Sequence, residues 1–175
     1  MECSLRPFRM EDADLLAAAL NNRNVQDNLR DGLPYPYTKE NAKEHITETL
    51  QANSHVTFSF AIISEEGLVG SIGAFRQCNI HCRTAEIGYY IAETFWGRGY
   101  ATSAVGQMCQ YLFEHTDMIR IFAEPFACNL ASCRVLEKNG FQCEGILRQN
   151  AQKNGAVLDM KMYSVLKEEF LRKNM

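Results

Sequence analysis

The chain has 175 residues, of which 46% are hydrophobic and 22% are charged, as in ordinary globular proteins. This length predicts a single domain over residues 1–175 with a sizeable core. The net charge of −3, without any local block of Lys and Arg, argues against a general nucleic-acid or membrane-surface binder. A small anionic ligand remains compatible, because one loop can bind phosphate without net positive charge.

The sequence carries no signal that we can interpret as a targeting segment or a metal site. The first residues, MECSLRPFRMEDADLL, lack the apolar core of a signal peptide, and the longest uncharged run, residues 99–113, is shorter than the ~20 apolar residues of a membrane span. We therefore expect a cytoplasmic protein whose seven cysteines are reduced thiols. The CNIHC stretch at 78–82 lacks the second ligand pair of a structural zinc site, so we interpret it as a loop and expect no metal.

Hydrophobic spacing predicts an alternation of elements in the first half of the chain. A short strand at 4–8 precedes a helix whose apolar stripe runs from Ala13 to Leu20, and the DGLPYPY stretch ends this helical region. Thr38 can cap a second helix. Three strands without an intervening helix follow, so we expect them to be antiparallel neighbours: residues 56–63, 68–75 and 84–92.

The second half of the chain predicts one crossover and a final hairpin. Asn129 stands at the start of one predicted helix and Gly140 at its end, and Asn154 with Gly155 lies in the hairpin connection. The fold class is therefore mixed α/β (α+β). The predicted elements are a helix at 101–113, a strand at 120–127, a helix at 129–141, and strands at 142–149 and 158–166.

The stretch FWGRGYATSAV at 95–105 places two glycines before a predicted helix. A dinucleotide fingerprint needs a third glycine where Thr102 stands, and a βαβ unit where this chain has successive strands. A P-loop needs Lys-Ser or Lys-Thr, and neither pair occurs. Two interpretations remain: a pyrophosphate cradle at a helix N-terminus, or a tight turn that packs the helix onto the sheet.

The WGRGYAT stretch resembles the Q/R-x-x-G-x-G/A element of the GNAT N-acetyltransferases, with Gly99 and Ala101 in the fixed positions. Trp96 stands where many members carry Gln or Arg. The resulting pattern W-G-x-G-Y-A-T is similar to that of the RimJ/RimL-type ribosomal-protein N-terminal acetyltransferases. Three further stretches resemble this branch in the same order, so the likeness spans almost the whole chain: LRPFRMEDADLL, AEIGYYI and NLASCRVLEKNGFQCEG.

The resemblance implies the GNAT acyl-CoA N-acyltransferase fold, a mixed, mostly antiparallel sheet of six to seven strands that splays at the cofactor site and is flanked by helices. It also implies acetyl-CoA as cosubstrate. Backbone N–H groups of residues 97–102 would hold its pyrophosphate, the strand edge at 88–91 would pair with the pantetheine arm, and an N–H near Tyr90 would polarise the acetyl carbonyl. The residues assigned in this way to the cofactor are Gly88, Tyr89, Tyr90, Ile91, Gly97, Arg98, Gly99, Tyr100, Ala101, Thr102, Asn129 and Ser132.

Catalytic roles follow from the same resemblance. Glu86 matches a glutamate that acts as a base through water, against the alternative of a charged residue on a solvent-facing strand, and we favour the base. Ser132 matches a serine that hydrogen-bonds the CoA sulfur, against a plain helix-facing serine. Asn129 would contact the cofactor, cap its helix, or do both. Arg134 and Lys138 would reach the 3′-phosphate or stay solvated.

The acceptor is implied only as a class: a protein N-terminal α-amine, of the ribosomal-protein type, or a small primary amine. We expect residues 21–37 and 149–158 to wall its site. Tyr35 and Tyr37 are the candidate lining residues, against ordinary packing under a loop. The alternative function is a non-catalytic acyl-CoA-binding sensor or scaffold, against which the presence of both Glu86 and Ser132 argues. The branch contains monomers and homodimers, and the sequence does not select between them.

Overall fold

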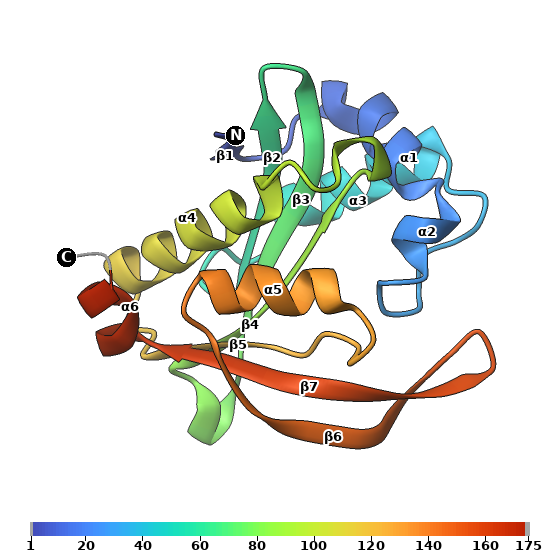
Figure 1. Ribbon diagram of the computed structural model, residues 1–175. Helices are drawn as coiled ribbons and strands as arrows, with labels where there is room; N and C mark the ends of the chain where they lie inside the picture. The colour runs from blue at the N-terminus through green and yellow to red at the C-terminus, as the bar shows by residue number, and fades with distance from the viewer. Residues whose placement is uncertain (1, 174–175) are drawn as a thin grey trace. The chain divides into compact units, whose positions relative to one another are not determined.

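The computed structural model describes residues 2–173. Its helices are α1 Ala13–Leu20, α2 Arg23–Gln26, α3 Lys39–Gln51, α4 Tyr100–His115, α5 Leu130–Lys138 and α6 Lys167–Lys173, with 3-10 turns η1 Met10–Asp12, η2 Asn79–His81 and η3 Glu93–Phe95 (Figure 1). Its strands are β1 Ser4–Arg6, β2 Thr57–Ser64, β3 Gly67–Arg76, β4 Thr84–Ile91, β5 Arg120–Ala123, β6 Gln142–Lys153 and β7 Ala156–Leu166. Within these residues, no helix has both the length and the apolar composition of a membrane span.

The strands form one mixed sheet in the order β1-β2-β3-β4-β5-β7-β6. The pairs β1–β2, β5–β7 and β6–β7 are antiparallel, and β4–β5 is parallel. Two backbone bonds show that β3 and β4 are antiparallel, because the partner of Val69 is Ala92 and the partner of Gln77 is Thr84. The predicted mixed sheet is confirmed, and its strand number is seven. A crossover through α4 joins the parallel strands β4 and β5, and a second one, through α5, joins β5 to β6 across β7, so the prediction of one crossover is wrong.

The strand ends differ from the prediction in the second half of the chain. The predicted hairpin connection at 149–158 is wrong, because β6 and β7 continue until only Asn154 and Gly155 lie between them. Their φ angles of 51° and 80° fit a two-residue hairpin turn that keeps both strands paired. The predicted strand at 120–127 ends early at Ala123, two residues before Pro125, which has no N–H to donate to a ladder. The short helices α2 and α6 were not predicted.

The described chain divides into two compact units. Unit 1 comprises Met1–Gly73 and Tyr89–Ala104, and unit 2 comprises Ala74–Gly88 and Val105–Met175. Strands β3 and β4 and helix α4 contribute residues to both units. The single domain expected from chain length therefore stays a prediction, and each unit is described by itself below.

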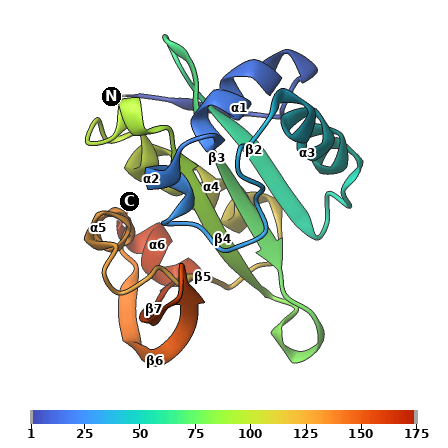
Figure 2. The same ribbon diagram turned by 90° about the vertical axis from the view of Figure 1, so that its right-hand side faces the viewer.

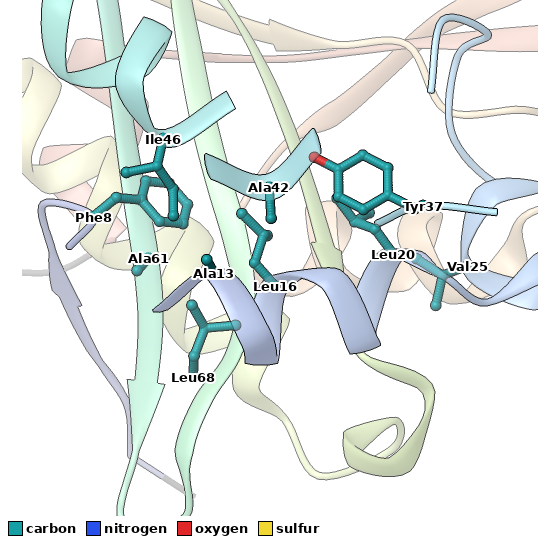
Figure 3. Close-up of a cluster of buried hydrophobic side chains, with 10 residues drawn as sticks. All are labelled: Phe8, Ala13, Leu16, Leu20, Val25, Tyr37, Ala42, Ile46, Ala61 and Leu68. Atoms are coloured by element: carbon teal, nitrogen blue, oxygen red, sulfur yellow. The ribbon is translucent and has the colours of Figure 1, made fainter. Parts of the chain in front are cut away.

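Unit 1 is built around a cluster of buried side chains on one face of β2 and β3. Helices α1 and α3 lie side by side over this face (Figure 2), and the predicted cap of α3 is confirmed, since Thr38 Oγ1 accepts a hydrogen bond from Asn41 N at 3.3 Å. Leu16 of α1 and Ile46 of α3 have no exposed surface, and each contributes about 1.5–3 kcal/mol by burial. Figure 3 shows the cluster: Phe8, Ala13, Leu16, Leu20, Val25, Tyr37, Ala42, Ile46, Ala61 and Leu68.

In unit 2, the apolar face of α4 is buried together with β5, β7 and the helices α5 and α6. The ring of Phe113 in α4 lies 5.6 Å from that of Phe170 in α6, which explains why α6 forms beyond the last strand. At the base of the hairpin, the guanidinium of Arg120 donates to both carboxylate oxygens of Glu144, at 2.6 and 2.7 Å. Ser164 Oγ donates to the same carboxylate at 2.7 Å, which ties β5, β6 and β7 together.

Candidate active site

The glycine loop lies in unit 1, between the turn η3 and the first residue of α4. Gly97 and Gly99 have φ angles of 76° and 86°, in the left-handed region that glycine enters at little cost. The helix begins at once after them, and its first backbone bond joins Ser103 N to Gly99 O at 3.1 Å. The glycines therefore turn the chain sharply from the end of β4 into a helix of 16 residues.

This loop presents hydrogen-bond donors without acceptors. Among residues 2–173, the backbone N–H groups of Gly97, Gly99 and Ala101 have no acceptor. They stand at the N-terminal end of a long helix, where the aligned peptide dipoles favour negative charge. A methyl group placed on Gly97 would meet no atom within 4 Å, so the space in front of that residue is open. The loop has the chemistry of an anion cradle.

Side chains before and after the glycines hold the loop in shape. Trp96 Nε1 donates to Ile91 O at 2.7 Å, and the rings of Phe95 and Tyr100 meet edge to face with centroids 6.2 Å apart. Arg98 Nη1 donates to Glu66 Oε1 at 2.7 Å in an exposed ion pair with the β2–β3 turn. The side chain of Arg98, which we expected near the cofactor, thus already has a carboxylate partner.

Sequence reasoning missed Gly70, a buried glycine in β3 beside the end of β4. A Cβ at this position would lie 2.2 Å from Tyr90 O and 3.0 Å from Ile91 Cα, a clash with backbone that no side chain can relieve. The two strands therefore meet here only because Gly70 has no side chain. The available signal was a glycine inside the strand pattern LVGSIGAF, which marks a close backbone approach.

The aromatic candidates of unit 1 differ in their surroundings. Tyr37 is 4% exposed and belongs to the core cluster. Burial raises the pKa of its hydroxyl, and the negative charges of Glu44 and Glu48 raise it further. Tyr35 is 47% exposed, with the guanidinium of Arg23 3.6 Å from its ring centroid. Of these two tyrosines, Tyr35 presents its ring at the surface of the unit, whereas Tyr37 has the environment of a packing residue.

Tyr90 packs its ring against the same core cluster. Its hydroxyl is the one buried side-chain N or O atom in the described part of the chain that makes no hydrogen bond. Burial raises the pKa of this hydroxyl above its ordinary value. The contribution of Tyr90 that we expect at the cofactor strand is a backbone contribution, and its side chain serves the core of unit 1.

Glu86 and Gly88 lie on the part of β4 that belongs to unit 2. Glu86 is half-buried between the buried residues Ala85 and Ile87, and it pairs in register with Phe122 of β5. The parallel ladder joins residues 84–86 of β4 to β5, and β4 continues beyond it to Ile91. Gly88 is exposed, and a Cβ there would meet no atom within 4 Å. The face of β4 that carries Gly88 is therefore open next to the carboxylate of Glu86, two positions earlier in the strand.

Helix α5 in unit 2 carries the other predicted residues. Asn129 Oδ1 accepts a hydrogen bond from Ser132 N at 3.1 Å, which confirms the predicted helix cap. Ser132 is half-buried in the first turn, and Arg134 and Lys138 are exposed. The capping bond fixes the side chain of Asn129 at the helix start and leaves its Nδ2 group available for a cofactor contact.

The predicted site residues are thus distributed over both units. Unit 1 holds the glycine loop, residues 89–91 and both tyrosines of the expected acceptor site, and unit 2 holds Glu86, Gly88, Asn129 and Ser132. Cys78 and Cys82 are exposed thiols on either side of η2. Within residues 2–173, no group of three or more His, Cys, Asp or Glu side chains is arranged to hold a metal ion.

Comparison with known proteins decides the family. The sequence matches the acetyltransferase (GNAT) domain over residues 3–142. The protein belongs to the GNAT acetyltransferase family. This GNAT protein is 35% identical over 133 residues to the probable N-acetyltransferase YjcK of Bacillus subtilis, covering 74% of each chain. It is 30% identical over 105 residues to the ribosomal-protein-serine acetyltransferase of Escherichia coli, covering 60% of this chain and 58% of that one.

Solved structures confirm the fold of this GNAT enzyme. Mycobacterium smegmatis RimJ, solved in complex with CoA-disulfide, superimposes with a TM-score of 0.86 at 24% identity, over 95% of this chain and 83% of that one. The resemblance to the RimJ/RimL-type branch is therefore confirmed, and the protein is an N-acetyltransferase. Members of this family use acetyl-CoA and an amine acceptor.

Proposed function

We propose that this GNAT enzyme transfers the acetyl group of acetyl-CoA to a protein N-terminal α-amine by direct attack on the thioester. The observation that carries the cofactor is the glycine loop, with left-handed Gly97 and Gly99 and unbonded N–H groups at the start of α4. The α-amine rests on the likeness to the Escherichia coli ribosomal-protein-serine acetyltransferase. A small primary amine is the competing acceptor.

The proposed chemistry gives each candidate residue one task. Glu86 accepts, through a water molecule, the proton that the attacking amine loses as its nitrogen bonds to the thioester carbon. The backbone N–H near Tyr90 stabilises the oxyanion of the tetrahedral intermediate. The hydroxyl of Ser132 donates a proton to the sulfur as the carbon–sulfur bond breaks, so that CoA leaves as a thiol, and Ser132 regains a proton from solvent. Asn129 contacts the cofactor with the amide group that its capping bond leaves available.

The cradle is tested by two matched glycine substitutions. Gly97→Ala and Gly155→Ala introduce a methyl group at φ angles of 76° and 80°, and neither methyl meets an atom within 4 Å. Their backbone strain is therefore similar, whereas only Gly97 lies in the loop. We expect Gly97→Ala to weaken CoA binding by at least about tenfold, or ~1.4 kcal/mol, and Gly155→Ala to leave it unchanged. Isothermal titration calorimetry with CoA measures both; equal affinities would contradict the cradle.

The acceptor is tested by turnover. Release of free thiol from acetyl-CoA is measured with short peptides that differ in their N-terminal residue, beside spermidine and an aminoglycoside. Faster turnover on peptides supports the α-amine, and faster turnover on a polyamine or aminoglycoside replaces it with the small-amine acceptor. CoA binding without turnover on any amine would contradict the proposed transfer.

A further inference from the structure

The acidic residue that begins η3 contacts a distant segment with both of its carboxylate oxygens. Glu93 Oε2 accepts a hydrogen bond from Asn22 Nδ2 at 2.6 Å, and Glu93 Oε1 accepts one from Asn24 Nδ2 at 2.7 Å. All three residues belong to unit 1, although the asparagines precede Glu93 by 71 and 69 positions. These two bonds lower the pKa of Glu93, so the group accepts as a carboxylate and both bonds are charge-assisted.

Both partners of these bonds have further fixed contacts. Asn22 Oδ1 accepts a bond from Val25 N at 3.3 Å and caps α2, so only its amide nitrogen can face the carboxylate. The main-chain oxygen of Glu93 accepts from Trp96 N at 3.1 Å, which closes the turn before Gly97. Glu93 therefore joins the start of α2, through its side chain, to the entry of the glycine loop, through its backbone.

The start of α2 is in turn connected to the exposed tyrosine of the expected acceptor wall. Arg23 follows Asn22 directly, and its guanidinium stacks on Tyr35 at 3.6 Å from the ring centroid. Tyr37, two residues after Tyr35, donates its backbone N–H to Asn21 Oδ1 at 3.0 Å. A displacement of Asn22 would thus move both ends of residues 21–37, which we call the α2 segment.

We propose that Glu93 is a positioning residue, which holds the α2 segment, and with it Tyr35, in register with the loop that binds the cofactor. This inference rests on the proposed function, because the role of Tyr35 toward the acceptor is part of that proposal. Loss of the carboxylate then weakens acceptor binding more than cofactor binding, since the glycine loop keeps its own contacts through Trp96 and Phe95.

A charge exchange tests the contact. Glu93→Gln turns an NH2 group toward one of the two asparagine NH2 groups, so one bond becomes a donor–donor contact. Adding Asn24→Asp returns an acceptor opposite that NH2 group. With a peptide that begins with serine as probe, we expect Glu93→Gln to raise the acceptor KM about tenfold while CoA affinity changes less than about twofold, and the double variant to recover. Asp14→Asn, which removes an exposed carboxylate bonded to Lys39 in the same unit, serves as control.

Amide hydrogen exchange gives a readout that does not depend on turnover. We expect exchange in residues 21–37 to accelerate in Glu93→Gln and to return toward the wild-type rate in the double variant. An active wild type, with acceptor KM and exchange unchanged in Glu93→Gln, would overturn the positioning role. The same holds if the double variant shows no recovery. A wild type inactive on every amine overturns the proposed function itself, and the exchange pattern then distinguishes this failure from loss of the contact.

Discussion

The α2 segment and the β6–β7 hairpin each contain one of the two stretches that the sequence predicts as acceptor walls, residues 21–37 and 149–158, yet different groups hold them in shape. In the α2 segment, five carboxamide side chains make hydrogen bonds: Asn21, Asn22, Asn24, Gln26 and Asn28. In the hairpin, backbone pairs run from Gln142 opposite Ser164 to Lys153 opposite Ala156, with register shifts between Cys143 and Gly145 and between Leu147 and Ala151. A segment held by side chains depends on each residue, whereas a ladder of backbone bonds tolerates most substitutions.

The largest effect that we expect tests this contrast directly. Gln26 is 6% exposed, and its Nε2 donates to Leu20 O at 2.9 Å and to Pro34 O at 3.0 Å. Gln26→Ala leaves both carbonyl oxygens without this partner and should lower the free energy of unfolding by about 2–3 kcal/mol. Gln152→Ala, at an exposed position of β6, should change it by less than ~0.5 kcal/mol. Urea unfolding measures both, and equal losses would remove the distinction between the two regions.

A smaller effect concerns pH at the base of the hairpin. Hydrogen bonds from Arg120 and Ser164 hold the pKa of Glu144 at about 2, below its ordinary value of 4.5. A lowered folded-state pKa stabilises the protein above pH 4.5, and this contribution is lost as the pH falls from 4.5 toward 2. Because the Glu144 side chain is 43% exposed, we expect about 1 kcal/mol or less.

The measurement compares wild type with Glu144→Gln over this pH range. Other carboxylates titrate in both proteins, so the difference between their unfolding free energies isolates the contribution of Glu144. This difference should shrink as the pH falls. A difference independent of pH would mean that the ion pair contributes nothing that depends on ionisation.

The smallest effect is expected at the tip of the hairpin. Asn154 has a φ angle of 51°, which glycine adopts without strain, so Asn154→Gly should change the free energy of unfolding by less than ~0.5 kcal/mol. Thermal unfolding followed by circular dichroism is sufficient to detect a larger loss. Such a loss would show that the turn, and not only the ladder, holds the hairpin.

Local features of this protein were predictable from sequence because they depend on neighbours along the chain. The caps at Thr38 and Asn129 each join residues three positions apart, and the glycine loop needs only Gly97, Gly99 and the helix that follows. The order of the predicted strands and helices, and the mixed sheet that it implies, follow from periodicity of the same short range. The family resemblance also rests on these contiguous motifs.

Long-range contacts were decided only by the tertiary structure. The placement of β7 between β5 and β6, the backbone contact that requires Gly70, and the pairing of Arg98 with Glu66 each join segments that local pattern leaves independent. The two asparagines that donate to Glu93 lie about seventy positions before it, and no periodicity connects them. The sequence by itself determined a helix N-terminus suited to an anion and the family that uses it. Packing decided which side chains hold the surrounding segments, because such bonds form only where folding brings distant residues within hydrogen-bonding distance.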